Sequence, residues 1–280
     1  MEQLAYEQTP FGALLRSWRS ARRLSQLELS LISNVSQRHL SFLESGRGRP
    51  SRQMIFQLAG ALDIPLREQN DLLQAAGFAT AFRCSPLDTR AMEPVRQALE
   101  MVLAHHDPYP AIVVDRDWNL LMANQGMNTL LALAGEQESL WQRTCGDGPR
   151  NIMRLCLHPQ GLRPLIGNWE VAAPPIMARL LREQTTAPSE GISSLLSMLR
   201  EDDSIPLRWH QPEPSQQLAP VLALELVVGD HRLNLFSMIS TFGTPQDVTT
   251  DELRVETSFP ADTASASLLR ELAAHSRAGA

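Results

Sequence analysis

Arginine residues gather in one stretch of this 280-residue chain, between positions 16 and 52. The stretch contains eight arginines and only two acidic residues, Glu28 and Glu44, so its local charge is +6, whereas the whole chain carries −6. A basic patch on an acidic protein is typical of a site for a polyanion such as a nucleic acid, and a solvated charged surface is the alternative interpretation. The negative overall charge excludes a protein that coats nucleic acid along its whole length.

Five short helices within residues 1–78 are predicted to carry these arginines. Ser25 forms a capping-box pattern with Glu28 at the start of the second helix, and Ser36 suits the start of the third. Asn34 tolerates the positive φ that a tight turn between these two helices requires. A short helix, a tight turn and a capped third helix form the helix-turn-helix motif, which binds DNA.

Residues 26–65 resemble the XRE family of regulators, which are similar to phage repressors. The resemblance implies a five-helix, lambda-repressor-like domain that binds double-stranded DNA. Ser30 and Ser33 stand where this family usually has alanine, and Asn34 stands where it usually has glycine. All three are small or compatible with a turn. The segments that carry the resemblance are Gln26, Val35-Ser36, Leu43-Glu44-x-Gly46, Pro50-Ser51 and Leu58-Ala59-x-Ala61-Leu62.

The resemblance implies a role for each matched residue in DNA binding. Gln26, at the start of the second helix, is expected to bond a phosphate. Glutamine suits adenine and arginine suits guanine as bidentate partners, so Gln37 and Arg38 are expected to read bases. A helix-turn-helix used only for protein contacts is the alternative. Further contacts to bases or to the DNA backbone are expected from Ser36, His39, Ser41, Arg47, Arg49 and Arg52.

A linker over residues 79–94 leads to a second domain over 95–262 and a tail or helix over 263–280. The fold class is therefore mainly α with α+β, because strands with a hairpin signal at Gly229-Asp230 accompany the helices of the second domain. A PAS-like domain begins with a strand, a tight turn, a second strand and a helix. Helices are expected at 93–104, 127–133, 151–157, 169–184, 192–200 and 264–280, and strands at 111–115, 118–123, 218–228, 233–242 and 253–259.

The second domain resembles the ligand-binding domain of MmyB-like regulators, a PAS-like module that accompanies XRE helix-turn-helix domains. Residues 243–247 depart from the pattern of that family. The resemblance implies a small hydrophobic effector, with a fatty acid or similar lipid as the best candidate. The matching segments are Val114-Asp115-x-x-Trp118, Ala123-Asn124, Asn151-x-x-Arg154, Trp169 and Leu180-Leu181-Arg182.

An elongated apolar pocket is expected between the sheet and the helices around residues 151–184. Methionine adapts to irregular ligands, and concave apolar sites with a few polar anchors are the norm for small molecules. Arg154 suits a carboxylate, and Asn124 and Asn151 are the other polar anchors. The alternative is that these side chains simply fill a core. The candidate ligand-binding residues are Trp118, Met122, Asn124, Asn151, Met153, Arg154, Trp169, Met177, Phe236 and Met238.

Other chemistry has little support in the sequence. No phosphate-binding loop, nucleophile elbow or paired-cysteine zinc motif is present, so no catalytic residue, metal or cofactor is expected. The three cysteines are too few and too scattered for a disulfide framework. The apolar runs are shorter than the ~20 residues that span a bilayer, so a soluble cytoplasmic protein is expected, without a membrane partner.

Two hypotheses of different classes follow. In the first, the protein is an effector-controlled transcriptional regulator that binds an inverted-repeat operator as a homodimer, with the second domain as the dimer surface. In the second, it is an enzyme, substrate-binding or carrier protein whose helix-turn-helix only contacts other proteins. A salt-dependent shift of a duplex that carries an inverted repeat separates the two hypotheses.

Overall fold

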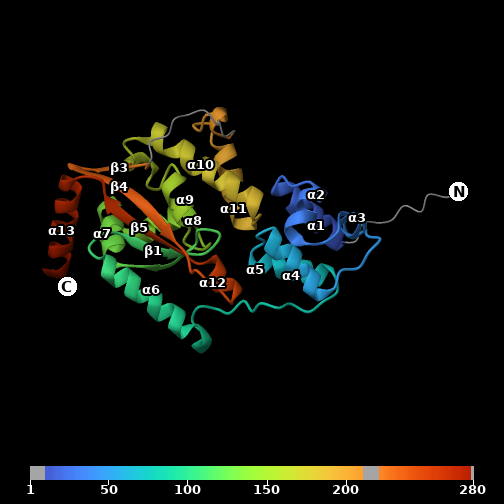
Figure 1. Ribbon diagram of the computed structural model, residues 1–280. Helices are drawn as coiled ribbons and strands as arrows, with labels where there is room; N and C mark the ends of the chain where they lie inside the picture. Colours follow the sequence, from blue (N-terminus) through green and yellow to red (C-terminus); the bar gives the residue numbers. More distant parts are fainter. Residues whose placement is uncertain (1–9, 211–220, 279–280) are drawn as a thin grey trace. The chain divides into compact units, whose positions relative to one another are not determined.

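A computed structural model describes residues 10–210 and 221–278 (Figure 1). The chain forms two compact units. The first contains Met1–Pro86 together with Thr244–Asp251, and the second contains Leu87–Gly243 and Glu252–Ala280. Residues 244–251 come from within the range predicted for the second domain, but they pack in the first unit. The domain limits expected at residues 78, 94 and 262 stay predictions.

The five predicted helices of the first unit are confirmed. Ser25 and Glu28 form both hydrogen bonds of the capping box, and Asn34 adopts the left-handed conformation with φ 51°. Ser36 and Ser51 accept hydrogen bonds from the backbone of the third and fourth helices. The helices are α1 (Pro10–Ala21), α2 (Gln26–Ser33), α3 (Gln37–Glu44), α4 (Arg52–Ala61) and α5 (Leu66–Ala75), and the short α12 (Val248–Glu252) lies almost wholly in this unit.

A close contact between α1 and α3 holds α3 in place. Gly12 makes it possible, because a Cβ atom there would lie 2.5 Å from the main-chain oxygen of Leu43. Leu40 and Leu43 of α3 are fully buried in the same core as Leu15 of α1. Burial of such side chains contributes roughly 1.5–3 kcal/mol each, so α3 is anchored by its apolar face.

The second unit contains a five-stranded antiparallel sheet with the order β2-β1-β5-β4-β3. The α+β architecture predicted for this region is confirmed. The strand expected from Trp118 begins instead at Leu120, because Trp118 adopts φ 68° in the turn after β1. The strand expected over residues 218–228 corresponds to β3, which begins at Leu224. The expected starting residue, 218, lies outside the described residues. The strands are β1 (Ala111–Val114), β2 (Leu120–Ala123), β3 (Leu224–Val228), β4 (His231–Ser240) and β5 (Arg254–Pro260).

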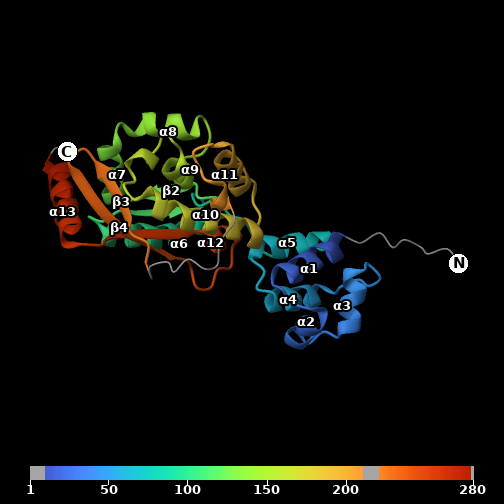
Figure 2. The same ribbon diagram turned by 90° about the horizontal axis from the view of Figure 1, so that it is seen from above.

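Helices cover both faces of this sheet, as Figure 2 shows. On one face α6 (Glu93–His106) packs Leu99 and Leu103 against alternate residues of β1. On the other face Ile112 and Val114 of β1 join a larger core with helices α8 to α11. The helices on this unit are, besides α6, α7 (Gln125–Ala134), α8 (Gln137–Cys145), α9 (Ile152–Leu157), α10 (Trp169–Thr186), α11 (Glu190–Glu201) and α13 (Thr263–Ala278), with 3-10 turns η1 (Arg90–Met92), η2 (Arg163–Leu165) and η3 (Leu207–His210).

Candidate DNA-binding surface and effector cavity

Helix α3 presents a polar face opposite its buried leucines. The Ser36 hydroxyl accepts a hydrogen bond from the backbone N–H of His39 at 3.3 Å and so fixes the start of the helix. Gln37, Arg38 and Ser41 are exposed, and His39 is half-buried. The Arg38 guanidinium lies over the ring of Phe42, 5.4 Å from its centroid. The expected base-reading side chains are therefore accessible on one short, well-anchored helix.

Gln26 is held by a buried carboxylate. Its amide nitrogen donates to Glu44 Oε2 at 2.9 Å, and Arg19 donates to both oxygens of Glu44 at 2.6 and 2.8 Å. Burial alone would raise the pKa of Glu44, but the hydrogen bonds from these two donors and the charge of Arg19 outweigh it and lower the pKa. One of the eight clustered arginines is thus neutralised, and α1, α2 and α3 are joined at one point.

The remaining predicted backbone contacts flank α3. Arg47 and Arg49 are exposed in the connection between α3 and α4. Arg52 begins α4, donates to the carbonyl oxygen of Ala79 at 3.2 Å and lies over the ring of Phe56. These exposed cations directly follow α3 in the chain, a position suited to contacts with a phosphate backbone. The DNA-contact roles themselves stay predictions.

A cavity of about 770 Å³ lies in the second unit between strands β3 to β5 and helices α9 and α10. The cavity lies between the sheet and the helices around residues 151–184, where the sequence predicts an apolar pocket. The lining combines aliphatic side chains with a few charged ones, which is typical of small-molecule sites. The residues are Ile152, Met153, Cys156, Ile166, Pro175, Ile176, Arg179, Arg182, Glu183, Thr186, Val221, Leu222, Leu224, Leu235, Ser237 and Glu256.

A network of charges around Trp118 forms one side of this cavity. Glu183 accepts hydrogen bonds from Trp118 Nε1 at 2.8 Å, Arg179 Nε at 2.9 Å and Arg254 Nη1 at 3.1 Å. Both guanidinium groups also lie over the Trp118 ring, at 4.4 and 5.2 Å from its centroid. Burial alone would raise the pKa of Glu183, but the two arginines and the indole donor outweigh it and lower the pKa. Arg179 and Arg254 are therefore committed to a carboxylate of the protein.

Arg182 is the cavity-lining cation that remains available. Its side chain is exposed, and it makes no ion pair or side-chain hydrogen bond with any residue in the described ranges. It lies on α10 one residue before Glu183. An unpaired guanidinium at the border of an apolar cavity is suited to a carboxylate or phosphate, which it binds with two parallel hydrogen bonds.

Two other groups that line the cavity, Cys156 and Glu256, have raised pKa values. Burial, with the nearby charge of Glu256, raises the pKa of the Cys156 thiol to about 12. Burial also raises the pKa of Glu256. Because the thiolate is the form that attacks electrophiles and binds metals, Cys156 is unsuited to either chemistry at neutral pH.

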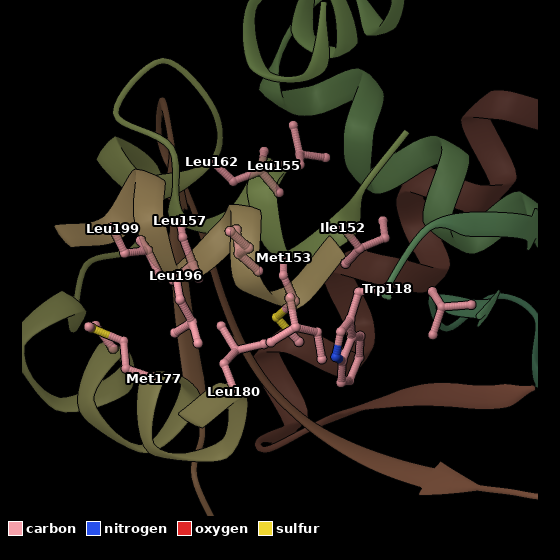
Figure 3. Close-up of a cluster of buried hydrophobic side chains, with 14 of the residues drawn as sticks. Trp118, Ile152, Met153, Leu155, Leu157, Leu162, Met177, Leu180, Leu196 and Leu199 are labelled. Atoms are coloured by element: carbon pink, nitrogen blue, oxygen red, sulfur yellow. The ribbon is translucent and has the colours of Figure 1, made fainter. Parts of the chain in front are cut away.

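Several predicted ligand-binding residues lie in the packed core or on the sheet instead of the cavity. Figure 3 shows Trp118, Met153 and Met177 within one cluster of buried side chains, and of these Met153 also lines the cavity. Met122 packs against the α6 side of the sheet. On β4, Met238 is 56% exposed, while Phe236 stacks on Phe259 with ring centroids 5.5 Å apart.

The predicted polar anchors are occupied by the fold. Asn124 caps α7, accepts from the backbone of Ala111 and donates to two carbonyl oxygens. Asn151 caps α9 and donates to the carbonyl oxygen of Asp117 at 2.6 Å. Arg154 donates to the hydroxyl of Ser194 at 3.3 Å. None of these three side chains belongs to the described residues that line the cavity.

Trp169 also lies outside the cavity lining. Its ring packs edge-on against Trp209, and the Arg163 guanidinium lies 4.5 Å from its centroid. Sequence reasoning missed Arg179, Glu183 and Glu256. Signals for them existed: the first two interrupt the apolar face of a long predicted helix, and Glu256 is a carboxylate between Val255 and Thr257 in a predicted strand.

No helix in the described part of the chain is long and apolar enough to cross a membrane.

Residues 15–69 match the helix-turn-helix family, and residues 95–272 match the MmyB-like transcription regulator ligand binding domain. The chain is similar to RghRB of Bacillus subtilis (strain 168), described as an uncharacterized HTH-type transcriptional regulator: 33% identical over 106 residues, 38% of this chain and 68% of that protein. Helix α3 and the cavity are thus parts of a chain that belongs to the family of MmyB-like transcription regulators with a ligand-binding domain.

Proposed function

We propose that this regulator binds an inverted-repeat operator as a homodimer and that a medium- or long-chain fatty acid in the cavity changes its affinity for DNA. The observation that carries the proposal is the pairing of a largely aliphatic cavity with Arg182. A fatty acid has the same two parts, an apolar chain and one carboxylate. The volume of about 770 Å³ falls within the range of small-molecule pockets, roughly 300–1,000 Å³.

Arg182 is the proposed carboxylate anchor, ahead of Arg154. Arg154 has a partner in Ser194, whereas Arg182 lines the cavity. The acyl chain would lie along Met153, Ile176 and Leu235, which come from α9, α10 and β4. Such a ligand contacts both layers, so its binding can favour one arrangement of sheet and helices over another, as control of DNA affinity requires.

DNA recognition is assigned to α3 and its flanks. Gln37 and Arg38 are exposed at the start of an anchored helix, and the cations after it suit the phosphate backbone. One such module reads few base pairs, so we propose that two copies bind half-sites about one helical turn apart, roughly 34 Å.

Calorimetric titration of the full chain with fatty acids of increasing length tests the effector. Each buried CH₂ group contributes about 0.8 kcal/mol, so affinity should rise about fourfold per CH₂ until the cavity is full. Arg182→Gln should weaken dodecanoate binding about tenfold, because a charge-assisted hydrogen bond contributes about 1.5 kcal/mol. Arg200→Gln, an exposed position on α11 outside the cavity, is the matched control.

Methyl dodecanoate supplies the second comparison. It keeps the apolar chain but lacks the charge, so it should bind wild-type protein about as weakly as dodecanoate binds Arg182→Gln. Equal affinity of wild-type protein for acid and ester would refute Arg182 as the anchor. Absence of binding by any chain length would refute the fatty-acid proposal. Failure to shift any duplex selected from a random pool would refute DNA binding.

A further inference from the structure

Residues 244–251 complete the DNA-binding unit from a distant part of the sequence. Val248 is 1% exposed, and its backbone N–H donates to the carbonyl oxygen of Arg83 at 2.8 Å. Asp247 accepts from the backbone N–H of Ser85 at 3.2 Å and from its hydroxyl at 2.7 Å. Asp247 also accepts from the backbone of Thr249 and so holds the start of α12. The segment is therefore fixed to residues 83–85 by main-chain and side-chain bonds.

The same segment supplies a cap that α5 lacks. Pro65 occupies the N-cap position, and its side chain has no acceptor for the free amides of the first turn. Asp251 provides the acceptor: its Oδ2 receives the backbone N–H of Leu66 at 2.9 Å, from 185 residues away. A carboxylate at this end of a helix is also favoured by the helix dipole. Helix α5 contributes the buried Leu72 and Leu73 to the core that anchors α3.

Both ends of the segment continue into strands that line the cavity. It follows β4, which contributes Leu235 and Ser237, and it precedes β5, which contributes Glu256. The last residues of β4 pair directly with the start of β5, with Ile239 opposite Glu256. A change in the spacing or register of these two strands therefore acts on both ends of the segment at once.

We propose that residues 244–251 are a strap through which strands β4 and β5 control the DNA-binding unit. When the strap is docked, Asp251 caps α5 and Asp247 holds residues 83–85. A group that fills the cavity against β4 and β5 moves the ends of the strap, weakens these bonds and thereby alters the packing beneath α3. The strap goes beyond the proposed function, because it does not depend on the chemical identity of the effector.

Amide hydrogen exchange of the full chain tests docking without DNA or effector. Asp247→Ala combined with Asp251→Ala should speed exchange of residues 66–70 and 81–85 about fivefold, the change expected for a lost helix cap. Asp71→Ala is the control, since Asp71 is exposed on α5 and makes no hydrogen bond or ion pair with the described residues of the unit. Unchanged exchange in the double variant would overturn the strap.

Ser237→Trp tests the coupling, because it places a ring in the cavity from β4. The substitution should change the rate of amide exchange of residues 66–70 at least threefold when the strap is intact. When Asp247 and Asp251 are both replaced by alanine, the change should be less than twofold. Ser237→Leu is a smaller probe for use if the tryptophan prevents folding. An equal response with and without the strap aspartates, or no response at residues 66–70, would overturn the proposal. Because this comparison uses neither DNA nor a fatty acid, its failure is distinct from failure of the proposed function.

Discussion

Glu44 joins three helices of the DNA-binding unit, and its removal should be costly. The Glu44 side chain is 5% exposed and that of Arg19 is 13% exposed. Glu44→Ala removes the acceptor of three hydrogen bonds and leaves the guanidinium of Arg19 without its carboxylate. Breaking a buried ion pair from one side costs about 3–5 kcal/mol. Arg19 retains a bond to the carbonyl oxygen of Leu24, so we expect about 3 kcal/mol.

Amide exchange of α1 and α3 measures this cost, because it reports on the helices of the first unit separately from the rest of the chain. Asp71→Ala is the control for loss of a negative charge at an exposed position. Replacing both members of the pair, Arg19→Met with Glu44→Leu, should recover most of the stability, since no charge is then left unpaired. A cost below about 1 kcal/mol for Glu44→Ala would refute the reasoning.

The same carboxylate makes the unit sensitive to acid. The pKa of Glu44 in the folded protein lies below its ordinary value of 4.5. The folded state therefore binds fewer protons than the unfolded state in this range, and the stabilisation is complete above pH 4.5. It is lost as the pH falls through the lowered pKa. Unfolding of α1 and α3 should accordingly begin below pH 4.5 in wild-type protein and show less pH dependence in Arg19→Met with Glu44→Leu.

Three further predictions concern other parts of the molecule. Arg38→Ala should cost about 1–3 kcal/mol on the selected operator and relax base preference at one position per half-site, whereas Arg49→Ala should weaken binding to all duplexes evenly; operator titrations with shuffled duplexes distinguish the two. Cys156 should resist iodoacetamide at pH 8 because its pKa is about 12, while the exposed Cys84 reacts; modification of Cys156 at the rate of Cys84 would contradict its burial. Gly12→Ala should destabilise the DNA-binding unit by about 1–3 kcal/mol, because the new Cβ lies 2.5 Å from a main-chain oxygen of α3; an unchanged melting curve would show that α1 moves freely.

The five helices α1 to α5 were predictable because their signals are local. The capping box at Ser25, the left-handed Asn34 and the cap at Ser36 each depend on residues no more than three positions apart. The start of β2 was misplaced for the converse reason. Trp118 looks like a strand residue, but its ring is buried against arginines far along the chain, and its backbone turns to place it there.

The polar wall of the cavity depends on contacts that sequence spacing does not reveal. Trp118 and Glu183 are 65 residues apart, and Arg254 reaches Glu183 across 71 residues. The sequence indicated an apolar pocket in this region, but it could not distinguish arginines committed to Glu183 from one that is available. Helix α8 was not predicted, because its buried residues are few and adjoin turns at both ends.

The discontinuous DNA-binding unit has a consequence for the order of events during translation. Residues 1–86 leave the ribosome long before residues 244–251, which complete the unit. At about 5–20 residues per second, the interval is roughly 10–30 seconds. During that time α5 lacks the carboxylate that caps it, and a chain that terminates early never acquires one. Full closure of the DNA-binding unit thus requires that β3 and β4, two of the strands that line the cavity, have already been synthesised.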